Sequence, residues 1–220
     1  MFVLNIKAAL CFLVFLVSLL ISPTPLAEQG LPNPKEIVPL LQTSQNPFYT
    51  AYNYFQTGAY DKAITAFRQF IKDNPKHILL DYAYFYVGIS LIQTAQAEEA
   101  RKTFELLKTA YPQSLLLADV DFLIADSYYF QGKYDIARQL YLALKTNKRY
   151  QRHSRLPEVY LKLGQCYEQT KQLSAARKEY HQAQLTFSAH PIYQRAKERE
   201  DALLTQYPVL QKEITAEAVL

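Results

Sequence analysis

Three stretches of the chain repeat one another and decide its fold: QTGAYDKAITAF at 56–67, QTAQAEEARKTF at 93–104 and FQGKYDIARQLY at 130–141. Gly58, Ala95 and Gly132 hold the same place in these stretches and are 37 residues apart. A fixed period of this size is typical of a protein built from copies of one supersecondary unit. One copy cannot bury its apolar face, whereas stacked copies bury a continuous core.

Each copy has the pattern of two packed helices. In the second copy, two sets of residues lie at spacings of three and four, which places each set on one helical face: Tyr84, Val87, Gly88 and Leu91, then Ala100, Phe104 and Leu107. Gly88 and Ala100 are small because the two helices approach closely there. Gly164 and Ala176 repeat the arrangement in the fourth copy.

Glycine and proline mark the ends of these helices. Gly58 and Gly132 fall at the turn inside a hairpin, where a positive φ costs glycine little. Pro75 and Pro112 end the second helices of their copies, since proline cannot continue a helix. Pro191 suits the first turn of a closing helix over 191–206, which is polar on one side.

The repeats resemble the tetratricopeptide family, whose pattern is W-x2-L-G-x2-Y, then A-x3-F, then P. The copies supply matching residues in order: Ala51, Tyr54, Ala63, Phe67, Pro75; Tyr84, Val87, Gly88, Leu91, Ala100, Phe104, Pro112; Ile124, Ala125, Tyr128, Ala137, Tyr141; Tyr160, Leu163, Gly164, Tyr167, Ala176, Tyr180. The resemblance implies an all-α fold, a right-handed α-solenoid of about four hairpins with a carboxy-terminal capping helix. The expected repeat domain is 47–206, followed by a tail at 207–220.

In this family the first helix of each hairpin lines a concave groove. The resemblance implies that ten residues here contact a protein or peptide partner: Tyr52, Phe55, Tyr82, Phe85, Ile89, Phe122, Asp126, Tyr129, Gln165 and Glu168. Aromatic side chains with a polar tip are common interface anchors. The alternative is that some of these rings only pack between repeats. No basic clamp for a terminal carboxylate is visible, so binding of chaperone tails is not expected.

The stretch KTNKRYQRHSR at 145–155 replaces the closing proline of the third copy and contains no acidic residue. Its basic patch consists of Lys145, Lys148, Arg149, Arg152 and Arg155. Such a patch could meet anionic lipid headgroups, a phosphate-rich glycan or an acidic partner. The alternative is a solvated loop or helix end, where the helix dipole already favours lysine.

The amino terminus has the pattern of an export signal or a membrane anchor. Lys7 precedes an uncharged apolar stretch at 8–22, and Pro25-Leu26-Ala27 comes before Glu28. A basic start, an apolar run of this length and a small residue before a polar one match a secretory signal, residues 1–27. We expect 28–46, which is rich in proline, to be an extended spacer. Both alternatives place the repeats outside the cytoplasm.

Composition and motifs give catalysis little support. The 220 residues have a formal net charge of +4, which is too mild to argue for nucleic acid. No His pair with Glu forms a metalloprotease motif, and there is no spare glycine for a phosphate-binding loop. Cys166 is expected to pack as a small residue. We therefore predict no enzyme activity, catalytic residue, metal, cofactor or small-molecule substrate.

The 37-residue period and the phrases GKYDIA and AYPQS resemble the bacterial envelope branch of the family. That branch includes the periplasmic protein of the Tol-Pal system and the lipoprotein subunit of the outer-membrane β-barrel assembly machine. The leading hypothesis is a non-enzymatic scaffold or adaptor, periplasmic or anchored to the inner membrane. One alternative is an obligate assembly subunit (pilot) of an outer-membrane, pilus or secretion machine. Another is an accessory protein that binds or processes cell-wall glycan.

Overall fold

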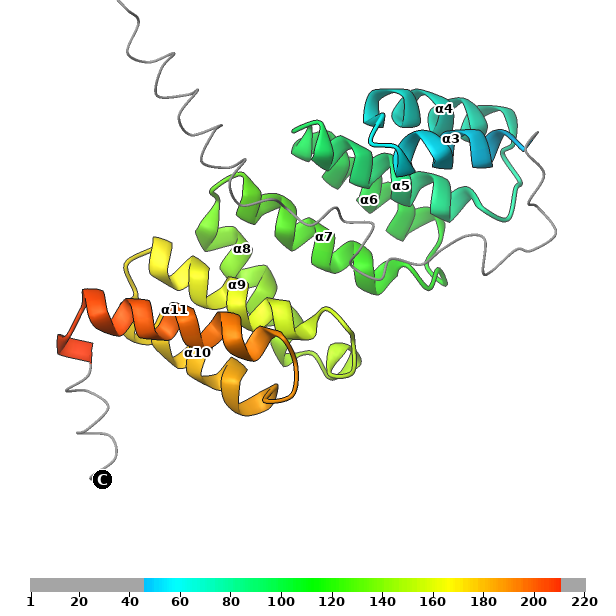
Figure 1. The fold of residues 1–220 in the computed structure, drawn as a ribbon. Coiled ribbons are helices and arrows are strands. Elements are labelled where there is room, and N and C mark those ends of the chain that lie inside the picture. Colours follow the sequence, from blue (N-terminus) through cyan, green and yellow to red (C-terminus); the bar gives the residue numbers. More distant parts are fainter. Residues whose placement is uncertain (1–45, 211–220) are drawn as a thin grey trace, which may run out of the picture. The chain divides into compact units, whose positions relative to one another are not determined.

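The computed structural model describes residues 46–210, and this part of the chain is all helix, turn and loop, without a strand. The predicted signal or anchor at 1–27 and nearly all of the predicted spacer lie outside the described residues, as do residues 211–220. The helices, shown in Figure 1, are α3 Pro47–Gln56, α4 Tyr60–Asp73, α5 Leu80–Gln93, α6 Ala97–Ala110, α7 Leu117–Phe130, α8 Tyr134–Thr146, α9 Leu156–Gln169, α10 Leu173–Thr186 and α11 Ile192–Gln206, with a short 3₁₀ helix η3 at Lys148–Tyr150.

The helices form where apolar residues recur at helical spacing. In α4 the buried residues are Ala63, Ile64, Phe67 and Phe70, which lie on one stripe of the helix. The second helices α4, α6 and α8 also complement the helix dipole, with acidic residues in the first turn and a lysine in the last. By contrast, α5 is buried on most of its surface, because helices pack against it from both neighbouring repeats.

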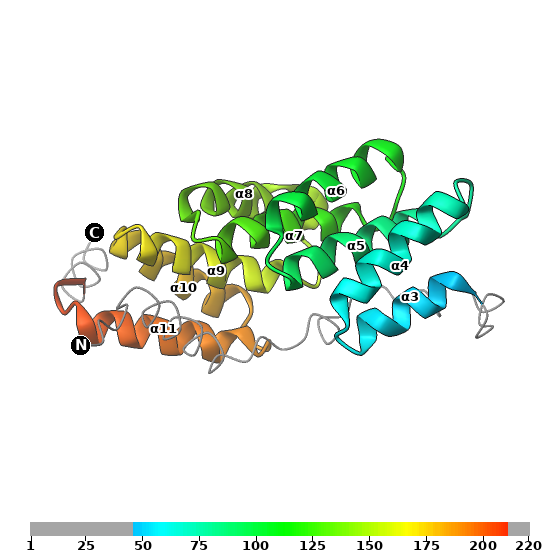
Figure 2. The ribbon, with the colours of Figure 1, turned by 90° about the horizontal axis from the view of Figure 1, so that it is seen from above.

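Each helix packs against the next one along the chain, so that four hairpins stack into an α-solenoid closed by α11 (Figures 1 and 2). First helices of neighbouring hairpins also touch, as α3 with α5 and α5 with α7, and α9 touches the closing helix α11. The packing between α6 and α7 is the least extensive of the consecutive pairs. The predicted all-α solenoid of four hairpins with a capping helix is therefore confirmed.

The two glycines expected at close helix crossings lie where a larger residue would overlap a ring of the facing helix. A Cβ added to Gly88 would overlap the ring of Phe104 on the second helix of the same hairpin. A Cβ added to Gly164 would overlap the ring of Tyr180 in the same way. The large ring on one helix thus fills the space that glycine leaves on its partner.

All four turns inside the hairpins have one backbone geometry. The second residue after the first helix has a positive φ in each copy, between 61° and 75°, at Gly58, Ala95, Gly132 and Lys171. The next N–H then donates to a carbonyl five residues earlier, for example Ala59 N to Tyr54 O at 2.8 Å, which is a Schellman cap. The turn glycines are confirmed, and Ala95 and Lys171 adopt the same conformation without glycine's freedom.

The junctions between hairpins share a second motif. Just before the next first helix, a side chain accepts a hydrogen bond from the backbone N–H two residues further on. His77 Nδ1 accepts from Leu79, Ser114 Oγ from Leu116, His153 Nδ1 from Arg155, and His190 Nδ1 from Ile192, at 3.1–3.3 Å. Three of the four histidines in the chain therefore hold helix starts, which is a structural role.

Candidate partner-binding face

The predicted groove residues of the first two hairpins are buried. Tyr52 and Phe55 on α3 pack around the ring of Tyr86, with ring centroids 5.0 and 4.9 Å away. Tyr82, Phe85 and Ile89 on α5 are likewise buried, and the latter two are 0% exposed. These side chains form core contacts between helices, so partner contact through them stays a prediction.

Among the predicted residues of the third and fourth hairpins, Asp126 is the centre of a hydrogen-bonded cluster. The Asp126 carboxylate on α7 is buried and accepts from Tyr141 of α8 at 2.6 Å. It also pairs with Arg155 Nη2 at 2.5 Å and with Lys162 Nζ of α9 at 2.6 Å. Arg155 Nη1 has no hydrogen-bond partner. Two cations thus meet one carboxylate, an arrangement that the sequence did not indicate because these residues are 29 and 36 positions from Asp126.

The electrostatics of this cluster follow from its burial and charges. Burial alone would raise the pKa of the Asp126 carboxyl, but the charges of Lys162 and Arg155, with hydrogen bonds from Lys162 and Tyr141, outweigh it and lower the pKa to about 2. Burial and the Asp126 charge raise the pKa of the Tyr141 hydroxyl well above its usual value. The carboxylate is therefore ionised and the phenol neutral at neutral pH.

Beside this cluster, partly buried polar side chains join the first helices α7 and α9 and the closing helix α11. Tyr129 on α7 donates its hydroxyl to Gln165 Oε1 on α9 at 3.0 Å. Glu168 on α9 accepts from Arg199 Nη2 on α11 at 3.1 Å and from the Tyr180 hydroxyl at 2.8 Å. Four of these residues (Tyr129, Gln165, Glu168 and Arg199) are only partly buried, and we call them the α7–α9–α11 row.

Phe130 lies at the end of α7 next to this row and is 63% exposed. The Lys162 ammonium lies 5.1 Å from the centre of its ring, which is a cation–π distance. Aromatic side chains and arginine are enriched at protein interfaces relative to the rest of the surface. Phe130 was missed from the sequence because it follows the last groove position of its repeat.

The five residues of the predicted basic patch do not form one surface. Lys145 pairs with Glu179 of α10 at 2.6 Å, and Arg155 points inward to Asp126. The 3₁₀ turn places the Tyr150 ring against Phe122, with centroids 5.7 Å apart, and its hydroxyl on Asp121. The exposed cations are Lys148, Arg149 and Arg152.

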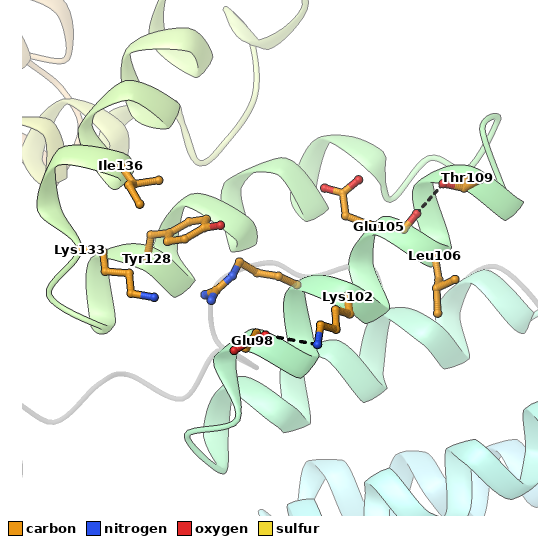
Figure 3. A pocket seen from close by; sticks show the side chains of 9 residues that line it. Glu98, Lys102, Glu105, Leu106, Thr109, Tyr128, Lys133 and Ile136 are labelled. Carbon is orange, nitrogen blue, oxygen red and sulfur yellow. Dashed lines mark hydrogen bonds and ion pairs between the residues drawn. The ribbon is translucent and has the colours of Figure 1, made fainter.

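A hollow of about 800 Å³ lies between the second helix α6, the end of α7 and the start of α8, as shown in Figure 3. We call this the outer side of the second and third hairpins. The Cζ atom of Arg101 lies 4.1 Å from the centre of the Tyr128 ring, and its guanidinium donates a hydrogen bond to Ser127 Oγ. Lys102 pairs with Glu98 on its rim. The residues that line it mix both charges with apolar side chains: Glu98, Arg101, Lys102, Glu105, Leu106, Thr109, Tyr128, Lys133 and Ile136.

Groups of the kind that support catalysis are engaged in packing. The Cys166 thiol is buried, and burial raises its pKa to about 12, which leaves it protonated at neutral pH. Within residues 46–210, His, Cys, Asp and Glu side chains do not gather in a group of three or more that could hold a metal ion. None of the helices in that range has the length and hydrophobicity that crossing a membrane requires.

The fold and this face define an α-solenoid repeat protein with an exposed polar and aromatic surface on its first helices. Two family models, each described as tetratricopeptide repeat, match residues 48–77 with 82–114 and residues 122–189. Together these segments span more than half of the sequence, and the chain belongs to the tetratricopeptide repeat family. Proteins of this family are generally non-enzymatic scaffolds for protein–protein interaction.

Solved structures show the same fold at low sequence identity. A putative kinesin light chain of Podosopora anserina with nearly identical TPR-like repeats is 15% identical, with a TM-score of 0.59 over 77% of this chain and 90% of that one. A tetratricopeptide repeat protein from Parabacteroides merdae is 13% identical, with a TM-score of 0.55 over 77% and 66%. Comparison with curated protein sequences found no match. These identities establish the architecture and leave the partner open.

Proposed function

We propose that the chain is a non-enzymatic adaptor that binds a protein partner on the α7–α9–α11 row and Phe130. The observation that carries this proposal is an exposed aromatic side chain beside a row of polar groups already linked across three helices. Side chains that are already hydrogen-bonded are held in place before binding. Little side-chain entropy is therefore lost when a partner binds them. Binding hot spots are enriched in tyrosine and arginine, and the row contains both Tyr129 and Arg199.

The proposal places the partner at the carboxy-terminal half of the predicted groove. There Tyr129, Gln165 and Glu168 remain partly accessible, whereas Phe85 and Ile89 at the other half are not. Buried groups contribute to binding only if the helices separate, which would expose apolar surface at considerable cost. Asp126 and Phe122 act from beneath by holding α7, α9 and the junction together.

We further propose that this adaptor works in a bacterial cell envelope. Support comes from the export-like segment at 1–27 and from the resemblance of the repeats to the envelope branch of the family. A reporter fused after residue 46 tests the placement. Activity of a periplasm-dependent reporter is expected, and a reporter active in the cytoplasm would contradict the proposal.

The partner is tested by crosslinking and affinity capture of the tagged full-length protein from the envelope fraction, read by mass spectrometry. The groove variant is Phe130→Ala/Arg199→Ala, and the matched control on the outer side is Leu106→Ala/Lys102→Ala. Loss of a hot spot costs 2 kcal/mol or more, roughly a 30-fold loss of affinity. Defined proteins captured by the wild type and the control but not by the groove variant would support the adaptor.

Two other results would favour the alternatives. Capture of a complete machine that is insensitive to the groove variant but lost in the control would indicate an obligate assembly subunit that uses its outer side. Hydrolysis or retention of purified peptidoglycan by the full-length protein would favour a glycan-directed accessory protein. Each variant is first compared with the wild type by thermal melting, so that loss of binding is separated from loss of fold.

A further inference from the structure

The junctions between hairpins present two apolar side chains to solvent. Ile78 is 72% exposed and Leu115 is 87% exposed, which are the two largest values among the large apolar residues of the described chain. Both stand between a capping residue and the N–H that it caps, His77 to Leu79 and Ser114 to Leu116. The capped turn therefore holds each side chain outward, and the exposure is a property of a fixed backbone.

The fold does not require an apolar residue at this place. The same position is occupied by Ser154 in the next junction and by Pro191 in the last, and both are exposed. Apolar side chains in two neighbouring junctions thus add nothing to the core. In a solenoid of antiparallel hairpins all these junctions lie along one edge, opposite the turns inside the hairpins.

The same edge carries unpaired positive charge. Lys76 precedes Ile78, and Lys148, Arg149 and Arg152 follow in the third junction, all of them exposed. No ion pair in the described part of the chain involves these four side chains, and Arg149 lies over the Tyr150 ring. The junction segments 74–79, 111–116 and 147–155 contain no acidic residue.

Most acidic residues near this edge are already engaged. Asp81 accepts from Ser114 Oγ at 2.6 Å, and Asp121 pairs with Lys108 at 3.0 Å. Asp119 faces His153 at 3.6 Å, and Glu158 pairs with Arg195. Asp73 is the exposed carboxylate, and it accepts from Gln69. The accessible charge of the edge is therefore positive.

We propose that this edge docks on an anionic lipid surface, with Ile78 and Leu115 entering the headgroup region and Lys148, Arg149 and Arg152 meeting the phosphates. Isolated apolar side chains flanked by cations suit a membrane interface, which accepts each one separately. The core of a protein–protein interface is depleted of charged residues, whereas the two apolar side chains here share their edge with four exposed cations. The surface is separate from the α7–α9–α11 row, so docking leaves that row available.

The chain contains no tryptophan, which makes a single introduced tryptophan a local reporter. We would prepare full-length Leu115→Trp, Ile78→Trp and the control Phe130→Trp, which reports from the opposite edge. Each variant is reconstituted separately with neutral vesicles of phosphatidylcholine and with anionic vesicles of phosphatidylcholine and phosphatidylglycerol. Emission wavelength and iodide quenching report on each position separately, so insertion of the amino-terminal segment does not mimic docking of the edge.

We expect a blue shift and protection from iodide for Leu115→Trp and Ile78→Trp on the anionic vesicles only, with Phe130→Trp unchanged. Adding Lys148→Gln/Arg149→Gln/Arg152→Gln should abolish the signal. Each cation near an anionic surface contributes roughly 5-fold to association, so the three together contribute on the order of 100-fold.

Three results would overturn the proposal. The first is an equal response of Leu115→Trp and Phe130→Trp. The second is the same shift on phosphatidylcholine alone, which would remove the role of the cations. The third is a response to soluble poly-glutamate without any response to vesicles, which would indicate an acidic protein instead of a membrane.

Discussion

The same repeat position is occupied by Ile89 in the second hairpin and by Asp126 in the third, and the two regions are stabilised in different ways. Ile89 is fully buried in an apolar region where rings pack on rings, such as Tyr86 stacked on Phe67 with centroids 5.6 Å apart. Asp126 is also buried, but it contacts two cations and a phenol. The same hairpin backbone therefore accommodates both an apolar and an ionic interior.

The contrast extends along each half of the solenoid. In α3–α6 the described ion pairs Arg68–Glu99, Lys102–Glu98 and Lys108–Glu105 lie at the surface. In α7–α11, Glu200 of the closing helix is buried and accepts from Gln184 at 2.5 Å, and Tyr180 donates to Glu168. Ionic contacts fix which groups face each other but depend on every partner being present, whereas apolar packing is less directional.

The largest effect is expected from removing the central charge of the ionic region. Asp126→Ile leaves the buried Arg155 and the partly buried Lys162 without this anion and should lower the free energy of unfolding by about 3–5 kcal/mol. Urea titration at neutral pH measures it. Ile89→Val, the control in the apolar region, should cost only about 0.5–1.5 kcal/mol. Equal effects of the two substitutions would show that the regions do not differ.

Converting the ionic region to the apolar type sharpens the test. Asp126→Ile/Arg155→Met/Lys162→Leu removes all three charges together and should recover most or all of the stability lost in Asp126→Ile, because replacing a buried ionic cluster with apolar residues is often neutral or stabilising by about 1–4 kcal/mol. Urea titration of the triple variant beside the single one gives the comparison. A triple variant as unstable as Asp126→Ile would mean that the backbone itself requires these charges.

Substitution of the glycines at the close helix crossings, one in each region, compares the apolar and the ionic region by steric overlap. Gly88→Ala and Gly164→Ala each push a methyl group into a ring and should cost about 1–3 kcal/mol. The cost at Gly164 should be about 1 kcal/mol larger, because displacing Tyr180 also weakens its hydrogen bond to Glu168. Thermal and urea melts measure both, and the double variant Gly88→Ala/Phe104→Leu should regain part of the loss. A larger cost at Gly88 would contradict this account.

Acid should weaken the ionic region selectively. The folded pKa of Asp126 is about 2, below its ordinary value of 3.8, so its contribution is present above pH 3.8 and is lost as the pH falls towards 2. The shift corresponds to about 2 kcal/mol at neutral pH. The stability difference between wild type and Asp126→Asn, from urea titrations at pH 7 and pH 3, should therefore shrink at the lower pH. The exposed Asp61→Asn of α4 is the control, and a difference independent of pH would refute the assignment.

The smallest effect is expected at two hairpin turns, one in each region. Ala95 and Lys171 have a positive φ that favours glycine, so Ala95→Gly and Lys171→Gly should each stabilise the protein by up to about 1 kcal/mol. Thermal melting measures the change, and Gly58→Ala should show the opposite sign. Similar gains in both regions would confirm that turn geometry is common to all hairpins even where their interiors differ.

Local signals in the sequence determined the fold. The 37-residue period predicted four hairpins. Gly88 and Gly164 predicted the close helix crossings, and Gly58 and Gly132 predicted the turns. These features can be predicted from the sequence because steric constraints and helical spacing act over a few residues. The closing helix, expected over 191–206, was found as α11 for the same reason.

Tertiary structure alone decided which polar groups meet. In sequence Arg155 is one of five basic residues in a run, yet it turns inward to a carboxylate 29 residues away, while Arg152 stays in solvent. The sequence likewise did not separate buried Phe85 from partly exposed Tyr129 among the groove positions. The free energy of a charge or a ring depends on its burial and on partners from other helices, and only the packed solenoid brings those together.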